Sequence, residues 1–268
     1  MERIMSMVFL PIQERTAVAD ALLPSRNFGV VVSGTARDQR MTWAGGVFND
    51  WAVTSDSYGN SSGQFVGRVT WLPFLSEDES NLFHLGFGAR YSTIKEGGQA
   101  LTEPEFNNAP AFVDSGPIVA DSSIMYDLEA SWRKGRFWLA AEYLASDIDS
   151  PTAGDPDFGG YHITASWVLS GEMRGYNKKS GILGKVPIAK SVYQGGWGAW
   201  EVGARWSELD LTEGMIDGGE MQIASVGLNW WLSPIFNVNV NYRHIGLDRF
   251  GLHGAAHGFN TRVLLVLE

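Results

Sequence analysis

The chain has 268 residues, of which 44% are hydrophobic and 19% are charged, and it contains no cysteine. The missing thiols exclude disulfide bonds and thiolate metal sites, and a net charge of -10 argues against nucleic acid as a partner. No apolar run approaches the roughly 18 residues of a membrane-spanning helix, which excludes a helical membrane protein.

Most of the chain alternates apolar and polar residues over segments of about ten residues, separated by Gly, Asp, Ser and Pro, a pattern that predicts strands. Residues 10–22 have a helical pattern instead. The eleven predicted strands cover residues 28–36, 40–48, 64–73, 81–93, 122–132, 136–145, 159–170, 198–209, 220–232, 235–246 and 258–268.

Each predicted strand has one apolar and one polar face, because successive side chains point to opposite sides of a sheet. The apolar faces hold residues such as Phe87, Leu228 and Trp230, and no charge lies centrally on them. The polar faces carry Asp127, Glu129, Glu142 and Glu201 together with Arg40, Arg68, Arg90, Arg136, Arg205, Arg243 and Arg262. Since an arginine facing lipid at the bilayer centre costs about 2–4 kcal/mol, this separation predicts an all-β, antiparallel transmembrane barrel.

The connections between the predicted strands alternate in length, as outer-membrane barrels require. Long outside loops are predicted at residues 49–63, 94–121, 146–158, 210–219 and 247–257. The inside connections are short except for residues 171–197, a basic stretch in which a further strand could lie. Residues 1–27 then approach the first strand from the outside.

From Leu169 onward, the motifs resemble those of the phosphate-selective porin family of the outer membrane, the porin O and P type. The residues that carry the resemblance are Gly171-Glu172 with Arg174 and Tyr176, Gly198-Ala199-Trp200-Glu201 with Arg205, Ser207 and Leu209-Asp210-Leu211, Ile216-Asp217-Gly218-Gly219, Gly227-Leu228-Asn229-Trp230 with Pro234, and Asn241-Tyr242. Met1-Glu2-Arg3 and Leu23-Pro24-Ser25-Arg26-Asn27 also resemble the family stretch that leads into a mid-chain strand.

The resemblance implies a barrel of about sixteen strands, a size that leaves an aqueous channel. About five N-terminal strands would then be absent. Residues 1–27 would be the tail of an inward-folding loop, and residues 28–268 the barrel strands and loops of a single domain. It further implies a Gram-negative outer-membrane location, contact with outer-membrane lipid, a homotrimer and passage of inorganic anions such as phosphate.

An anion pore needs fixed positive charge along a water-filled path. The inward arginines named above are the candidate anion-binding residues of the lumen, with Arg3, Arg15 and Arg26 as candidates in the entering loop. In the alternative interpretation, the inward arginines pair with the four inward carboxylates and only stabilise the wall. Two alternatives remain. The chain could be a non-specific structural or adhesive outer-membrane barrel, or a soluble β-sandwich that binds ligands in its loops.

No enzyme, cofactor or metal site is expected. The Gly-x-Ser-x-Gly pattern of residues 59–63 lies in a polar loop and not on a strand-to-helix elbow. His253 and His257 have the spacing of helical metal ligands, but they lie in a Gly/Ala segment predicted to be a loop.

Overall fold

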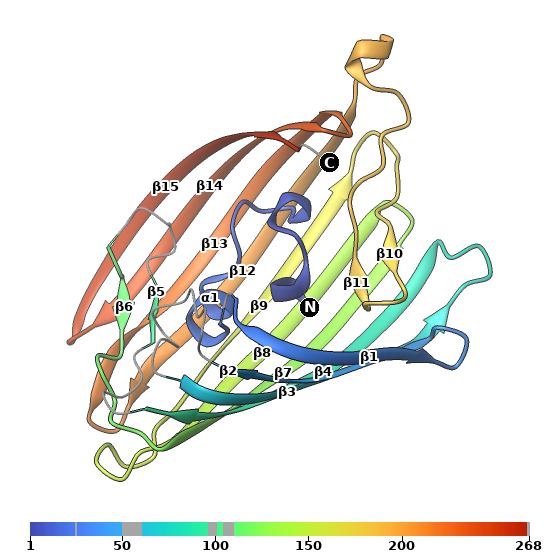
Figure 1. The fold of residues 1–268 in the computed structure, drawn as a ribbon. Helices are drawn as coiled ribbons and strands as arrows, with labels where there is room; N and C mark the ends of the chain where they lie inside the picture. Colours follow the sequence, from blue (N-terminus) through green and yellow to red (C-terminus); the bar gives the residue numbers. More distant parts are fainter. Residues whose placement is uncertain (25, 50–60, 96–100, 104–109, 267–268) are drawn as a thin grey trace.

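The computed structural model describes residues 1–24, 26–49, 61–95, 101–103 and 110–266. Eleven long strands form one curved antiparallel sheet (Figure 1). In sheet order they are β1 (Phe28–Ala36), β2 (Met41–Asn49), β3 (Ser61–Leu75), β4 (Asn81–Ile94), β7 (Ser122–Lys134), β8 (Phe137–Asp149), β9 (Asp157–Val168), β12 (Ala199–Glu213), β13 (Ile216–Ser233), β14 (Phe236–Arg249) and β15 (Leu252–Leu265). All eleven predicted strands are confirmed, except that the last two residues of the final one lie outside the described residues.

Sequential long strands pair with each other throughout, and within the described residues β1 and β15 do not pair with one another. The predicted outside loops 210–219 and 247–257 are wrong, because the strands continue through them. Only Gly214 and Met215 separate β12 from β13. Phe250 and Gly251, with φ of 55° and 69°, form the left-handed pair of a tight hairpin turn between β14 and β15. The apolar alternation fades towards these strand ends, although the backbone pairing continues.

The predicted helix at residues 10–22 is shorter than expected. Residues 1–24 form the 3-10 turns η1 (Glu2–Ile4) and η2 (Met7–Phe9) and one short helix, α1 (Ala17–Leu22). Thr16 caps α1, its hydroxyl accepting from the amide of Ala19. Among the described residues, no helix has the length and apolarity needed to cross a membrane.

The 171–197 connection holds no long strand. It contains a small hairpin, β10 (Tyr176–Asn177) with β11 (Ile182–Leu183), and the 3-10 turn η4 (Val192–Gln194). A second small hairpin, β5 (Thr102–Glu103) with β6 (Val113–Asp114), lies in the outside connection between β4 and β7.

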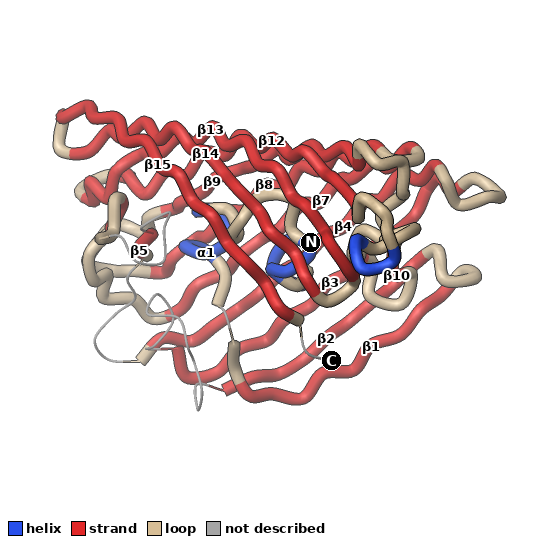
Figure 2. Tube along the Cα trace, turned by 90° about the horizontal axis from the view of Figure 1, so that it is seen from above, coloured by secondary structure: helices blue, strands red, loops and turns tan. Residues whose placement is uncertain are grey.

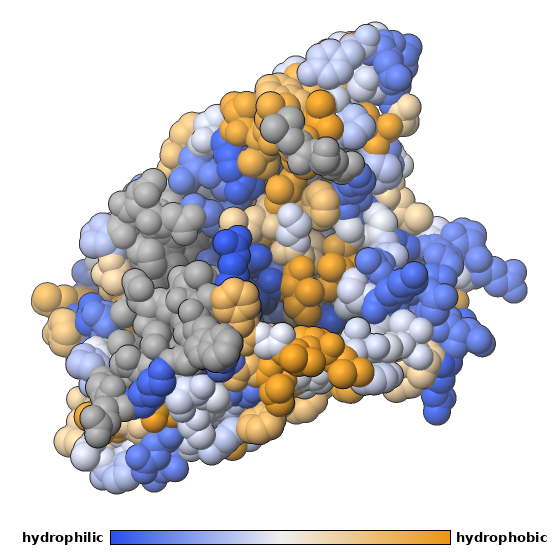
Figure 3. All heavy atoms as spheres, viewed as in Figure 1, coloured by the Kyte–Doolittle hydropathy of each residue, from blue (hydrophilic) through white to orange (hydrophobic). Residues whose placement is uncertain are grey.

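The predicted division of faces is confirmed along the sheet except on the edge strand β1, whose residues are exposed on both faces. The convex face carries exposed apolar side chains, for example Phe65 at 61%, Phe87 at 43% and Leu228 at 40% exposure. Polar side chains of the concave face, including Arg90 and Asn229, are buried. In Figure 3, hydrophilic residues also gather on the loops beyond the strand ends.

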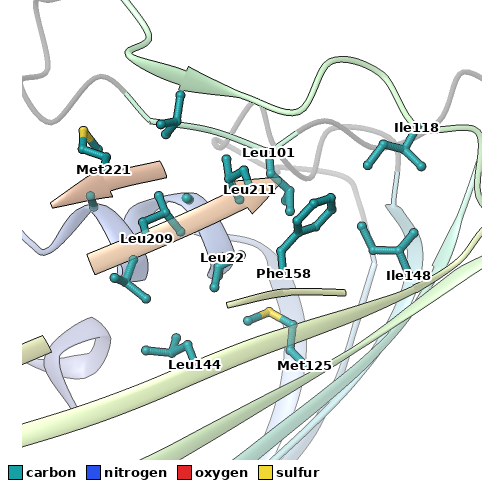
Figure 4. Packing of buried hydrophobic residues seen from close by; sticks show 14 of the residues in the cluster. Leu22, Leu101, Ile118, Met125, Leu144, Ile148, Phe158, Leu209, Leu211 and Met221 are labelled. Carbon is teal, nitrogen blue, oxygen red and sulfur yellow. The ribbon is translucent and has the colours of Figure 1, made fainter. Parts of the chain in front are cut away.

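The concave side of the sheet is filled by residues 1–24, which lie inside its curve (Figure 2). One apolar cluster joins Val18 and Leu22 of α1 to side chains of β8, β9, β12 and β13, such as Leu144 and Leu209 (Figure 4). A second joins Met1, Met5 and Leu10 to Trp138, Ala140 and Leu183. These apolar contacts cover part of the concave face with residues 1–24.

Leu228 faces outward in the middle of β13. Leu228→Arg is therefore expected to destabilise the folded protein in a bilayer, lowering its free energy of unfolding by about 2–4 kcal/mol. Met215→Arg, in the exposed β12–β13 turn, is the matched control and is expected to change it by less than about 0.5 kcal/mol. Urea titration of the protein in phospholipid vesicles measures both values. Equal effects of the two substitutions would contradict the assignment of the convex face to lipid.

Candidate functional site

A cluster of carboxylates lies at the centre of the concave face. Glu129 of β7 and Glu142 of β8 stand directly opposite each other, an arrangement that like charges disfavour. Arg68 of β3 compensates with a two-pronged contact, its Nε and Nη2 each 2.6 Å from a Glu129 carboxylate oxygen. His84 Nε2 lies 3.1 Å from Glu129, and the amino group of Met1 lies 2.8 Å from both glutamates. Arg68 is therefore part of the wall.

A cavity of about 250 Å³ opens beside this cluster, between residues 1–27 and strands β3, β4 and β7. Four arginines line it: Arg3, Arg26, Arg68 and Arg90. Among the described residues, Asp127 is the one carboxylate in its lining, and most other lining side chains are apolar. Cationic groups therefore outnumber anionic ones around this cavity.

Arg90 is 4% exposed and donates hydrogen bonds to side chains of β3. Its Nε donates to Gln64 Oε1 at 3.0 Å, and its Nη2 donates to Ser61 Oγ at 3.3 Å. These bonds to β3 hold the guanidinium at the lining of the cavity. Arg90 thus brings positive charge to the cavity.

Arg205, Arg243 and Arg262 form a second group on β12, β14 and β15, covered by residues 7–15. Arg205 Nη1 lies 3.3 Å from Glu2 Oε1 and donates to the Glu14 carbonyl at 3.2 Å. Arg243 Nη1 lies 3.1 Å from Glu14 Oε2, and Arg262, half-buried, donates to the Met7 carbonyl at 3.4 Å.

The pKa of Glu2 is lowered by its contacts with the surrounding residues. Burial acts to raise the pKa of Glu2, but His162, Arg205 and the hydrogen bonds from Thr16 together bring that pKa below its usual value. The Glu2 carboxylate accepts from both the amide and the hydroxyl of Thr16. Glu2 is therefore the anionic partner that ties the entering segment to β12.

The three candidate arginines of the entering loop also have different surroundings. Arg3 pairs with Asp20 and donates to the Pro24 carbonyl at 3.0 Å. Arg15 donates to the Met5 carbonyl at 3.2 Å, so both arginines brace residues 1–24 internally. Arg26 is exposed and lines the cavity.

The lumen positions predicted for Arg40 and Arg136 are wrong. Arg40 lies in the β1–β2 turn and is exposed. Arg136 lies in the β7–β8 turn, and its guanidinium stacks 5.5 Å from the ring centre of Trp167, an exposed side chain of the convex face. The two-residue alternation of the sequence predicts that both side chains point inward. Each residue lies just outside its strand, where the alternation of faces no longer applies.

Two inward arginines were missed by sequence reasoning. Arg174, in the 171–197 connection, makes a two-pronged contact with Glu201 at 2.7 and 2.6 Å and donates to the Phe9 carbonyl at 2.7 Å. Arg133 at the end of β7 donates to the Arg174 carbonyl at 2.7 Å. In the sequence, the basic character of the 171–197 connection is the one signal that indicates contact with the acidic residues of the concave face.

The hairpin of that connection crosses the concave face. Tyr176 reaches His84 of β4, with 2.8 Å between its hydroxyl and Nδ1, and burial raises the pKa of Tyr176. The carbonyls of Ser180 and Gly181 accept from Arg68 at 2.8 and 2.9 Å. At Gly181, an added Cβ would lie 2.5 Å from Thr70 Oγ1, so glycine permits this close approach.

The described residues contain no group of three or more His, Asp or Glu side chains able to hold a metal ion. Gly59 and Asn60 of the Gly-x-Ser-x-Gly pattern lie outside the described residues. His253 and His257 lie on β15, not in a loop.

Comparison with known proteins places this geometry in context. A family model described as phosphate-selective porin O and P matches residues 3–251. The chain is also 27% identical over 244 residues to an uncharacterized protein of Caulobacter vibrioides, an alignment that covers 85% of this chain and 48% of that protein. The chain thus spans about half the length of the curated relative it matches.

Arg174→Met is expected to release the 171–197 connection from the concave face. Removing one partner leaves Glu201 buried and unpaired, which costs about 3 kcal/mol. Tryptic cleavage after Lys179 and Lys185 should then accelerate on the order of a hundredfold, because proteolysis follows the population of the open form. Limited proteolysis in detergent measures this rate, with Arg136→Met as the matched control. Unchanged cleavage in the Arg174 variant would show that the ion pair does not hold the loop.

Proposed function

Because the chain belongs to the phosphate-selective porin O and P family, we propose that it forms the wall of a water-filled diffusion pore that prefers anions, with phosphate as the favoured class. Membership implies the bacterial outer membrane as its location and a channel rather than an enzyme. A homotrimer is the assembly that family resemblance favours.

The observation that carries the anion preference is the cavity beside β3, β4 and β7, whose described lining holds Arg3, Arg26, Arg68 and Arg90 and one carboxylate, Asp127. A guanidinium offers phosphate a planar fork of donors and stays charged at any relevant pH. The apolar lining strengthens each charge by lowering the local dielectric constant. Anions are therefore attracted to this cavity more strongly than cations.

The inward arginines have two different roles in this proposal. Arg68, Arg205 and Arg243 contact Glu129, Glu2 and Glu14, which favours the wall-stabilising interpretation for these three. Arg90 is oriented at the cavity lining by its hydrogen bonds to β3, and Arg26 is exposed there. These last two are the arginines that we expect a passing anion to meet.

Planar-bilayer conductance under a salt gradient, with and without phosphate, tests the proposed function. The reversal potential is expected to show anion preference, and phosphate is expected to reduce chloride current by occupying the path. A reversal potential of cation sign would remove the anion preference and keep the pore. Absence of channels would remove both.

Arg26→Gln and Arg90→Gln are each expected to lower the anion-to-cation permeability ratio about threefold. A unit charge at about 7 Å in water is worth about 0.6 kcal/mol, which corresponds to that factor. Arg136→Gln removes an arginine from the β7–β8 turn, away from the cavity, and is expected to leave the ratio unchanged. If all three variants shift the ratio equally, net charge and not the cavity sets the preference.

A further inference from the structure

An unusual pair of histidines lies on the outward face of β14 and β15, away from the cavity. His244 and His257 are directly opposite each other in the β14–β15 ladder, and both are exposed. The preceding outward pair on the same strands is Tyr242 with Phe259. The histidines therefore stand just beyond an aromatic pair, on the side of the β14–β15 turn.

The spacing of the two imidazoles matches a shared metal ion. The Nδ1 atoms lie 3.4 Å apart and the ring centres 4.8 Å apart. Two nitrogen ligands at about 2.1 Å from a tetrahedral ion lie about 3.4 Å from each other. Side chains directly opposite in an antiparallel pair have neighbouring Cβ atoms, so the backbone already holds both rings on one side of the sheet.

The surroundings of the pair supply a hydroxyl oxygen. The Tyr242 hydroxyl lies 2.8 Å from His257 Nδ1, the same nitrogen that faces His244. His253 is four residues from His257 on the same face, but its Nδ1 lies 2.9 Å from Asp248 Oδ2. His253 is thus engaged with a carboxylate and forms a separate contact.

We propose that His244 and His257 form a two-imidazole site for a first-row transition-metal cation, with water filling the remaining positions. Imidazole suits Zn²⁺ and Cu²⁺, and Cu²⁺ binds most tightly among these ions. A bound ion would join β14 to β15 at their turn end and stabilise the folded sheet by mass action. The site does not depend on the anion preference of the pore.

Isothermal titration of CuCl₂ and of ZnCl₂ into the detergent-solubilised protein tests the site. One ion per chain is expected to bind, with Cu²⁺ tighter than Zn²⁺ and with a rise in the unfolding temperature. His244→Ala and His257→Ala should each weaken binding at least about tenfold, since each removes one of two protein ligands. His253→Ala, an exposed histidine on the same face, is the matched control and should bind like the parent protein.

Several results would overturn the proposal. They are absence of stoichiometric binding, equal affinity in all three variants, and loss of binding in His253→Ala alone. Electron paramagnetic resonance of the Cu²⁺ form gives an independent readout, because two coordinated imidazole nitrogens are expected in the parent protein and one in each single variant. If an alanine variant does not fold, His244→Asn and His257→Asn keep a polar side chain of similar size and replace it.

Discussion

Charged side chains cannot face hydrocarbon without a large cost in free energy, and this constraint organises the protein. In their central parts, the long strands keep their arginines and glutamates on the concave face and present Val, Leu, Phe, Trp and Tyr on the convex face. Because side chains alternate along a strand, a shift of one residue in register would expose every charge to lipid. The division of faces therefore fixes strand register and gathers the charges in the lumen.

Charges gathered in this way must then compensate one another. Residues 1–24 bring Glu2 and Glu14 to Arg205 and Arg243. The 171–197 connection brings Arg174 to Glu201. Arg3, Arg26, Arg68 and Arg90 line the cavity between these segments, which links the packing of the lumen to its proposed anion preference. The histidines of β14 and β15 lie on the opposite face of the sheet, outside this network.

Strand number and the assignment of faces could be predicted from the sequence, because both follow from a two-residue period. The turn residues could not, since the period ends with the strand, and Arg136 therefore stacks on Trp167 outside the lumen. The docking of Arg174 depends on contacts with Glu201 and Phe9 that are distant in the chain, and no local pattern encodes them. The proximity of His244 and His257 likewise depends on the β14–β15 register. The sequence predicts a loop at residues 247–257, and a loop does not define that register.

The most direct test of the central claim is spin-label accessibility along β13. The chain has no cysteine, so single cysteines at residues 225–230 can be labelled without background in lipid vesicles. Labels at Val226, Leu228 and Trp230 should collide with oxygen dissolved in the bilayer, and labels at Ser225 and Asn229 should be shielded from it. The opposite phase, or no two-residue alternation, would contradict the assignment of the convex face to lipid and the pore that depends on it.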